Sequence, residues 1–150
     1  MYHYTESGLS NIWLVNGYAE HDTPYGDGAS IENVDGLHAA IGDMIVSATG
    51  PLSGEQIKFL RHELGCSQKR IGALLDVDSQ TVARWEKDQT AISGPADRLI
   101  RSYYKQKISG NVDVANVLEH LADADAADRV DRHHLQNSDL GWREADREAA

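Results

Sequence analysis

The sequence predicts a mainly α fold made of three successive regions. Apolar residues recur at helical intervals over most of residues 35–107, and Ser, Asp, Gly and Pro stand where helices would begin and end. Runs of aromatic and β-branched residues, which favour strands, are concentrated near the N-terminus. We therefore expect a small α+β unit over residues 1–50, a helical domain over residues 52–107, and a helix followed by an acidic tail over residues 108–150.

The N-terminal unit is expected to begin with short strands. Residues 2–5 and 12–15 are rich in aromatic and β-branched side chains, and a turn-prone segment separates them. Asn16-Gly17 is a strong hairpin signal, so a return strand is expected from Tyr18. Residues 22–30 contain a proline and two glycines and are expected to form a loop.

A helix is predicted after this loop, with Asp35 at its N-cap and Gly50-Pro51 at its end. Its apolar face would consist of Leu37, Ile41, Met44 and Ile45. A unit of about 50 residues is marginal for independent stability. We therefore expect it to pack on the middle domain or on a second copy of itself.

Four helices are predicted in the middle domain from their caps and apolar stripes. A capping box at residues 53–56 opens the first helix, and Ser67 caps the second. The third begins near Asp78 or Ser79, and a Ser-Gly-Pro segment at residues 93–95 opens the fourth. The expected buried residues are Ile57, Leu60, Leu64, Ile71, Leu74, Leu75, Val82, Trp85, Leu99, Ile100 and Tyr103.

The helical pattern weakens from Gly110. An amphipathic stretch continues to about residue 122, and the remainder is rich in Ala, Asp and Arg with few large apolar residues. We expect a partly helical or disordered acidic tail. Its removal, over residues 123–150, is expected to strengthen non-specific binding to nucleic acid.

The formal net charge of −10 is unevenly distributed. Residues 1–52 contain seven acidic residues and no Lys or Arg, whereas residues 53–107 contain ten basic and seven acidic residues, a net charge of +3. Residues 108–150 contain four basic and ten acidic residues, a net charge of −6. Any surface that binds a polyanion is therefore expected in the middle domain.

Composition excludes several classes of protein. A hydrophobic fraction of 41% argues against disorder throughout. No apolar run is long enough to cross a membrane, and the first residues do not form a secretory signal, so we expect a cytoplasmic protein. One cysteine, Cys66, rules out a disulfide framework and an all-cysteine zinc site. The seven histidines form no HExxH motif and no helical pair, so we expect no metal site.

The second and third helices of the middle domain have the spacing of a helix-turn-helix. Gly72 is small enough for a close helix crossing, and Asp76 tolerates the left-handed backbone that such a turn needs. Val77 is expected to fill the space between the helices. A plain helical bundle would show similar apolar stripes, but the polar residues also fit a DNA reader.

Those polar residues lie off the predicted core face. Gln80 and Arg84 are four residues apart and share a helix face, and their side chains match adenine and guanine edges. Ser67 opens a helix whose N-terminus favours a phosphate. The expected DNA-binding residues are Ser67, Gln68, Lys69, Ser79, Gln80, Thr81, Arg84 and Lys87.

Residues 52–104 resemble the Xre/Cro-type helix-turn-helix domain, a lambda-repressor-like fold, of phage repressors and bacterial regulators. The resemblance is carried by Ser67-Gln68, Gly72, residues 76–78 and residues 81–87. The pattern is most similar to the DNA-binding domain of MqsA-type antitoxins. It implies a homodimer that reads a palindrome in double-stranded DNA. Those antitoxins carry a four-cysteine zinc module, whereas residues 1–50 here contain no cysteine.

Two features outside the helix-turn-helix have alternative interpretations. Cys66 is expected to be a small buried hydrophobe rather than a redox switch. The aromatic residues of the N-terminal unit, Tyr2, Tyr4, Trp13, Tyr18 and Tyr25, are expected to form either its core or a surface for dimerisation or partner capture.

The sequence thus predicts a sequence-specific, repressor-like DNA-binding regulator without enzymatic activity or cofactor. The alternative is an antitoxin that binds a basic toxin and represses its own operon. A repressor that senses a small molecule through residues 1–50 is a third hypothesis. An enzyme is the least supported, because no catalytic arrangement of residues stands out.

Overall fold

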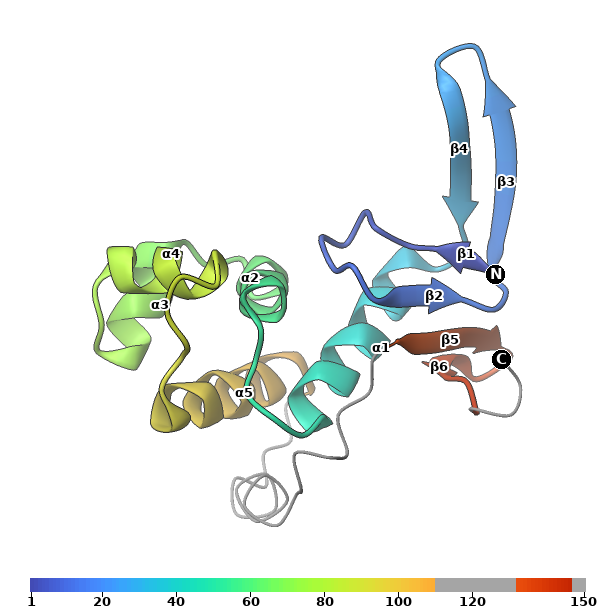
Figure 1. Ribbon diagram of the computed structural model, residues 1–150. Helices are drawn as coiled ribbons and strands as arrows, with labels where there is room; N and C mark the ends of the chain where they lie inside the picture. The colour runs from blue at the N-terminus through green and yellow to red at the C-terminus, as the bar shows by residue number, and fades with distance from the viewer. Residues whose placement is uncertain (110–131, 147–150) are drawn as a thin grey trace. The chain divides into compact units, whose positions relative to one another are not determined.

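The computed structural model describes residues 1–109 and 132–146, and its fold is α+β (Figure 1). The described residues contain five helices and six strands in two sheets, with 45% helix and 22% strand. The expected fold class, mainly α and lambda-repressor-like with a helical C-terminal tail, is therefore wrong. The difference arises because residues expected to form a loop and a tail pair as strands instead.

The chain divides into two compact units. The first combines residues 1–41 with residues 130–150 and contains the six described strands; we call it the sheet unit. The second, residues 42–129, contains helices α2 to α5 and is called the helical unit. The boundary between them falls within α1 (Val34–Ser47).

The main sheet has the strand order β1-β2-β5-β6. It is formed by β1 (Tyr2–His3), β2 (Ile12–Leu14), β5 (His133–Ser138) and β6 (Gly141–Glu144). β2 and β5 are parallel, and the outer pairs are antiparallel. The two central strands thus come from opposite ends of the sequence.

Side chains alternate across the main sheet as strand geometry requires. Ile12 and Leu14 of β2 are buried, whereas Trp13 between them is half-buried and stacks on His3. Leu14 lies beside Leu135 in the parallel register, and both are fully buried. The strands near the N-terminus were therefore predicted correctly, but their central partner was not.

A separate two-stranded hairpin follows β2. It consists of β3 (Tyr18–Thr23) and β4 (Gly26–Ile31), joined by Pro24-Tyr25. The expected hairpin between β2 and a strand from Tyr18 is wrong, because β3 pairs with β4. The loop expected over residues 22–30 is wrong as well, since most of it is the hairpin itself.

Helix α1 begins after Asn33, not at the expected cap Asp35. The Asn33 side chain accepts a hydrogen bond from the Gly36 N–H at 3.2 Å, and the Asn33 carbonyl accepts one from the Leu37 N–H. Leu37 and Ile41, on the predicted apolar face, are fully buried. The Tyr4 hydroxyl lies 2.7 Å from His38 Nε2, which links the first strands to this helix.

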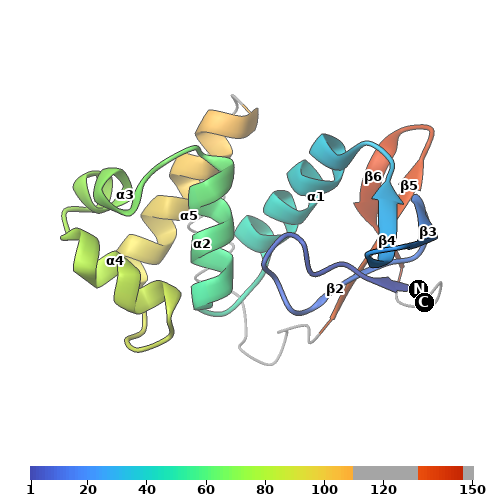
Figure 2. The same cartoon turned by 90° about the horizontal axis from the view of Figure 1, so that it is seen from above.

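The helical unit contains α2 (Gly54–Glu63), α3 (Gln68–Leu75), α4 (Ser79–Glu86) and α5 (Gly94–Ser109), as Figure 2 shows from above. The predicted capping box is confirmed: Ser53 and Gln56 each accept a hydrogen bond from the other residue's N–H. The predicted cap at Ser67 is also confirmed, and α4, expected to begin near Asp78 or Ser79, is capped by Asp78.

The core of the helical unit is close to the predicted one, except that Leu64, Leu74 and Leu75 are only half-buried and that α5 differs. Ile57, Leu60, Ile71, Val82 and Trp85 are buried. In α5 the buried stripe runs through Ala96, Ile100 and Tyr104, so Tyr104 takes the place expected for Tyr103, and Leu99 is 54% exposed. Ile100 is buried as predicted, whereas Leu99 and Tyr103 are not buried, and a buried arginine shares this face.

That arginine is Arg101, which is 1% exposed. Its guanidinium pairs with Asp97 at 2.7 Å and donates to the carbonyls of Ala48 and Gly50, where the chain leaves α1. Asp97 also accepts a hydrogen bond from the Leu52 N–H at 2.8 Å. A buried charge is tolerated when it is paired and hydrogen-bonded, so this network fixes the entrance to α2.

The expected partly helical or disordered tail is wrong for residues 133–144, which form β5 and β6. His133, Leu135 and Trp142 are buried there. The helix expected to about residue 122 lies outside the described residues. Among the residues that the structure describes, none of the helices is both long and apolar enough to cross a membrane.

Candidate nucleic-acid interface

The candidate interface is formed by α3, α4 and the three-residue turn between them. Ser67 begins α3, and its hydroxyl accepts a hydrogen bond from the Arg70 N–H at 3.0 Å. Asp76 ends α3 in the left-handed conformation, with φ of 59°, as predicted. Asp78 then begins α4 by accepting a hydrogen bond from the Thr81 N–H at 2.7 Å.

The hydrogen bonds from Thr81 hold the pKa of the Asp78 carboxyl below its usual range, and Arg84 nearby has the same effect. A carboxylate at this position is also favoured by the positive end of the helix dipole. The Asp78 cap therefore fixes the position at which α4 begins.

Gly72 allows the turn to approach α3 closely. A Cβ at this position would lie 2.6 Å from the carbonyl oxygen of Val77, a distance that real Cβ atoms do not adopt. The Val77 N–H also donates to the Gly72 carbonyl at 2.8 Å, and this hydrogen bond holds the turn against α3. The prediction that this position requires a small residue is confirmed.

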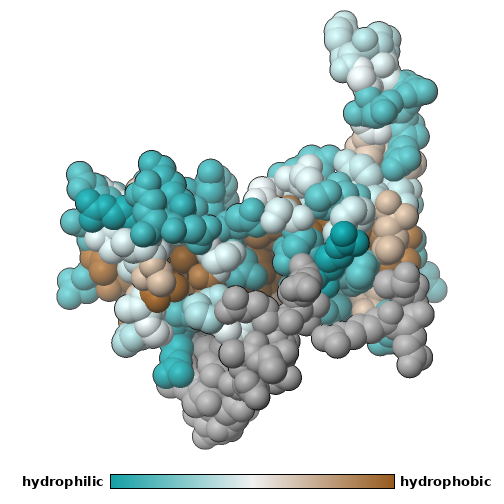
Figure 3. Space-filling view, in the orientation of Figure 1, coloured by the Kyte–Doolittle hydropathy of each residue, from teal (hydrophilic) through white to brown (hydrophobic). Residues whose placement is uncertain are grey.

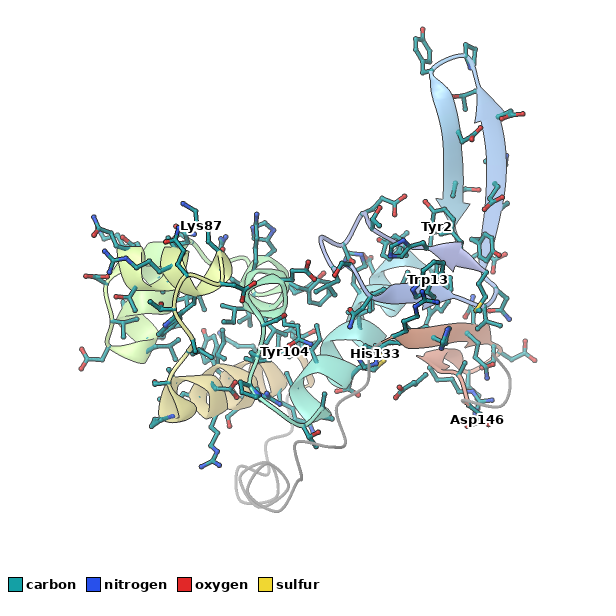
Figure 4. All side chains as sticks on the ribbon, viewed as in Figure 1. Tyr2, Trp13, Lys87, Tyr104, His133 and Asp146 are labelled. Atoms are coloured by element: carbon teal, nitrogen blue, oxygen red, sulfur yellow. The ribbon has the colours of Figure 1, made fainter. Side chains whose placement is uncertain are left out.

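Two buried side chains set the orientation of α4. Val82 is fully buried and Trp85 is 5% exposed. Because they lie three residues apart, they define one face of the helix, and the opposite face is left to solvent. The surface over α4 is hydrophilic in Figure 3, and Lys87 projects outward in Figure 4.

An ion pair joins the end of α4 to α2 and to the start of α3. Arg61 donates from Nε and Nη2 to the Glu86 carboxylate at 2.7 and 2.9 Å. Their side chains are only 12% and 5% exposed. Gln68 Nε2 donates to the same carboxylate at 3.3 Å, and Arg61 also donates to the Cys66 carbonyl. The three helices are therefore connected through one carboxylate.

The predicted DNA-binding residues differ in their exposure to solvent. Gln68 is half-buried and bonded to Glu86, and Thr81 is half-buried. The other six are exposed: Ser67, Lys69, Ser79, Gln80, Arg84 and Lys87.

Two further features were missed from the sequence. Arg70 is exposed beside Lys69 in the first turn of α3, and its adjacency to a candidate lysine was an available signal. The Arg61–Glu86 pair spans 25 residues, and no local pattern predicts it.

Cys66, expected to be buried, is half-buried, with its Sγ 3.7 Å from the Leu64 carbonyl.

Over residues 1–109 and 132–146, no group of three or more His, Cys, Asp or Glu side chains is placed to hold a metal ion. Comparison of the chain with protein-family models, curated proteins and solved structures finds no match.

Proposed function

We propose that residues 52–107 bind double-stranded DNA with sequence specificity and that the chain is a repressor-like transcriptional regulator. The observation that carries this proposal is the exposed face of α4, where Gln80 and Arg84 lie one turn apart on a helix anchored by Val82 and Trp85. An α-helix of this kind fits the major groove of B-form DNA.

Five of the six exposed candidate residues have a defined part in the proposed complex. Arg84 can donate two hydrogen bonds to guanine, and Gln80 can form a bidentate pair with adenine. The N-terminus of α3 at Ser67 favours a phosphate, because its N–H groups and the helix dipole point toward it. Lys69 and Lys87 would contact phosphates without regard to sequence.

The proposal includes a homodimer that reads a palindromic operator, with two recognition helices about one turn of DNA apart. It is supported by the sequence resemblance of residues 52–104 to Xre/Cro-type regulators, and by the net charge of +3 over residues 53–107. A regulator of this kind would act in the cytoplasm.

The test is selection of bound DNA from a random pool, followed by titration of the enriched sequence. Arg84→Ala is expected to weaken binding to that sequence by about 1–3 kcal/mol and to relax one base position. Arg98→Ala, which removes an exposed arginine from α5, is the matched control and should leave binding unchanged. Failure to enrich any motif, or equal binding by Arg84→Ala and the wild type, would contradict the proposal.

Lys87→Ala provides a second measurement of the same complex. It is expected to weaken all DNA sequences almost equally and to reduce the salt slope by about one. A loss confined to the preferred sequence would instead place Lys87 among the residues that read bases.

A second candidate function is that of an antitoxin that binds a basic toxin and regulates its own operon. The observation that favours it is the complete absence of Lys and Arg from residues 1–52, which contain seven acidic residues. Such a region is suited to a basic protein and unsuited to DNA. Copurification with a small basic protein whose activity the chain suppresses would support this function.

A further inference from the structure

The β3–β4 hairpin is anchored at its base and uncovered beyond it. Trp142 Nε1 donates to the Glu32 carbonyl at 2.9 Å, the Glu32 N–H donates to the Gly17 carbonyl, and a Cβ at Gly17 would collide with the Trp142 ring. Of residues 19–30, all but Ala29 are exposed. The hairpin projects from the main sheet in Figure 1, and its outer half is hydrophilic in Figure 3.

One face of the hairpin carries three carboxylates. Strand alternation and the pairing of Glu20 with Ala29 and of Asp22 with Asp27 place Glu20, Asp22 and Asp27 on the same side. Together with Tyr2, His21 and Gly28 they line a cavity of about 410 Å³. The opposite face carries small and polar side chains.

These carboxylates repel one another. Asp22 and Asp27 lie directly opposite each other, an arrangement that destabilises a strand pair when both groups are charged. The hydrogen bond with Asp22, and Glu20 nearby, raise the pKa of Asp27. Residues 1–52 contain no Lys or Arg, and none of the three carboxylates forms an ion pair with a described residue. A cationic partner would remove this repulsion.

The hairpin also presents two edges that pair with no other described strand. Within the described residues, β3 and β4 pair only with each other, and their register is continuous over six residue pairs. Proteins often protect such edges with charged side chains, proline or a bulge. Neither strand here contains proline or a bulge, and the acidic side chains they carry repel another acidic strand but not a basic one. An isolated two-stranded hairpin is marginally stable, so an added strand would stabilise it.

The charge of the hairpin decides between partners. A second copy of the chain would bring the same three carboxylates against the first three, which opposes pairing between copies. The three carboxylates are not placed to hold a single metal ion, because no group of three or more His, Cys, Asp or Glu side chains among the described residues has such an arrangement. A positively charged extended segment can form backbone hydrogen bonds with one edge of the hairpin and place basic side chains against the carboxylates.

We propose that the β3–β4 hairpin binds a Lys- or Arg-bearing segment of another protein, which adds as a strand to one edge and places basic side chains over Glu20, Asp22 and Asp27. The inference deepens the second candidate function and rests on it. It does not depend on DNA binding by the helical unit.

The test uses the full chain and a blocked peptide of alternating lysine and valine, with binding measured by calorimetry and amide exchange followed by NMR. The combined variant Glu20→Gln, Asp22→Asn, Asp27→Asn is expected to weaken binding about tenfold. The matched control, Asp43→Asn, Asp139→Asn, Asp146→Asn, removes three exposed carboxylates elsewhere and should change binding far less. Amides of β3 or β4 are expected to gain protection in the wild-type complex.

Two further probes separate this mode of binding from attraction to any polycation. The same peptide with alternate backbone amides methylated retains its charge but cannot extend a sheet, so it should bind more weakly. Spermine should not protect the hairpin amides.

Equal weakening by both triple variants, equal binding of the methylated peptide, or equal protection by spermine would overturn the proposal. Concentration-dependent dimerisation that protects the hairpin amides, and that the neutral triple variant strengthens because it removes the repulsion, would instead identify a second copy as the occupant. Because the assay contains no DNA, failure here leaves the DNA-binding proposal unaffected. If the chain binds the peptide as expected but suppresses the activity of no basic toxin, only the antitoxin role is contradicted.

Discussion

Removal of Arg61 should destabilise the helical unit far more than removal of an exposed arginine. Arg61→Met deletes two charge-assisted hydrogen bonds to Glu86 and one to the Cys66 carbonyl. It leaves the Glu86 carboxylate, which is 5% exposed, with the Gln68 amide as its remaining partner at 3.3 Å. Breaking a buried pair from one side costs about 3–5 kcal/mol because the second charge stays buried without compensation.

The measurement is urea unfolding followed by circular dichroism. Arg98→Met makes the same chemical change at an exposed position of α5 and should stay within about 0.5 kcal/mol of the wild type. The double variant Arg61→Met, Glu86→Leu removes both charges, so its cost should be smaller than the sum of the two single costs. A loss below about 1 kcal/mol for Arg61→Met would refute the reasoning, because that is the range of exposed pairs.

Three other predictions concern the same unit. Gly72→Ala should destabilise the chain by about 1–3 kcal/mol in thermal or urea unfolding, because the new methyl group meets the carbonyl of the α3–α4 turn, whereas Gly94→Ala enters open space and should be tolerated. The pKa of the Asp78 carboxyl is lowered in the folded chain. The stability that this carboxylate contributes is therefore complete above its usual pKa and is lost as the pH falls through the lower folded value. Asp78→Asn should accordingly lower the unfolding midpoint more at pH 5 than at a pH near 2. Burial and the nearby Glu63 and Asp43 carboxylates raise the pKa of Tyr104 to about 12, so its contribution is complete below the ordinary pKa of about 10 and is lost as the pH rises through 12. Ultraviolet titration should show a late-ionising tyrosine that Tyr104→Phe removes.

The helical unit could be predicted closely because its signals are local. Ser53, Ser67 and Asp78 each accept a hydrogen bond from an N–H three residues ahead, so the cap and its partner lie within one turn. Asp76 occupies the left-handed region within the same short segment. The change in the buried face of α5 has a different origin, since the buried Arg101 guanidinium donates to carbonyls about 50 residues earlier in the chain.

The strands near the N-terminus could be predicted, but the central pairing of the sheet unit could not, because it is not local. β5 lies beside β2 although about 120 residues separate them, and its sequence, HHLQNS, lacks the β-branched residues that favour strands. The glycines of β4 are typical of turns, so the sequence predicts a loop there. In both cases the strand depends on a partner that the segment itself does not reveal.

The position of β5 also changes the meaning of the acidic C-terminal region. The sequence suggested that residues 123–150 could be removed to test whether their charge opposes non-specific binding to DNA. That truncation would also remove β5 and β6, leave β2 without its parallel neighbour, and expose Ile12 and Leu14. It would take Trp142 from the base of the hairpin as well. Its effect on DNA binding would therefore combine lost charge with a disrupted sheet unit, and substitution of exposed carboxylates such as Asp139 and Asp146 separates the two.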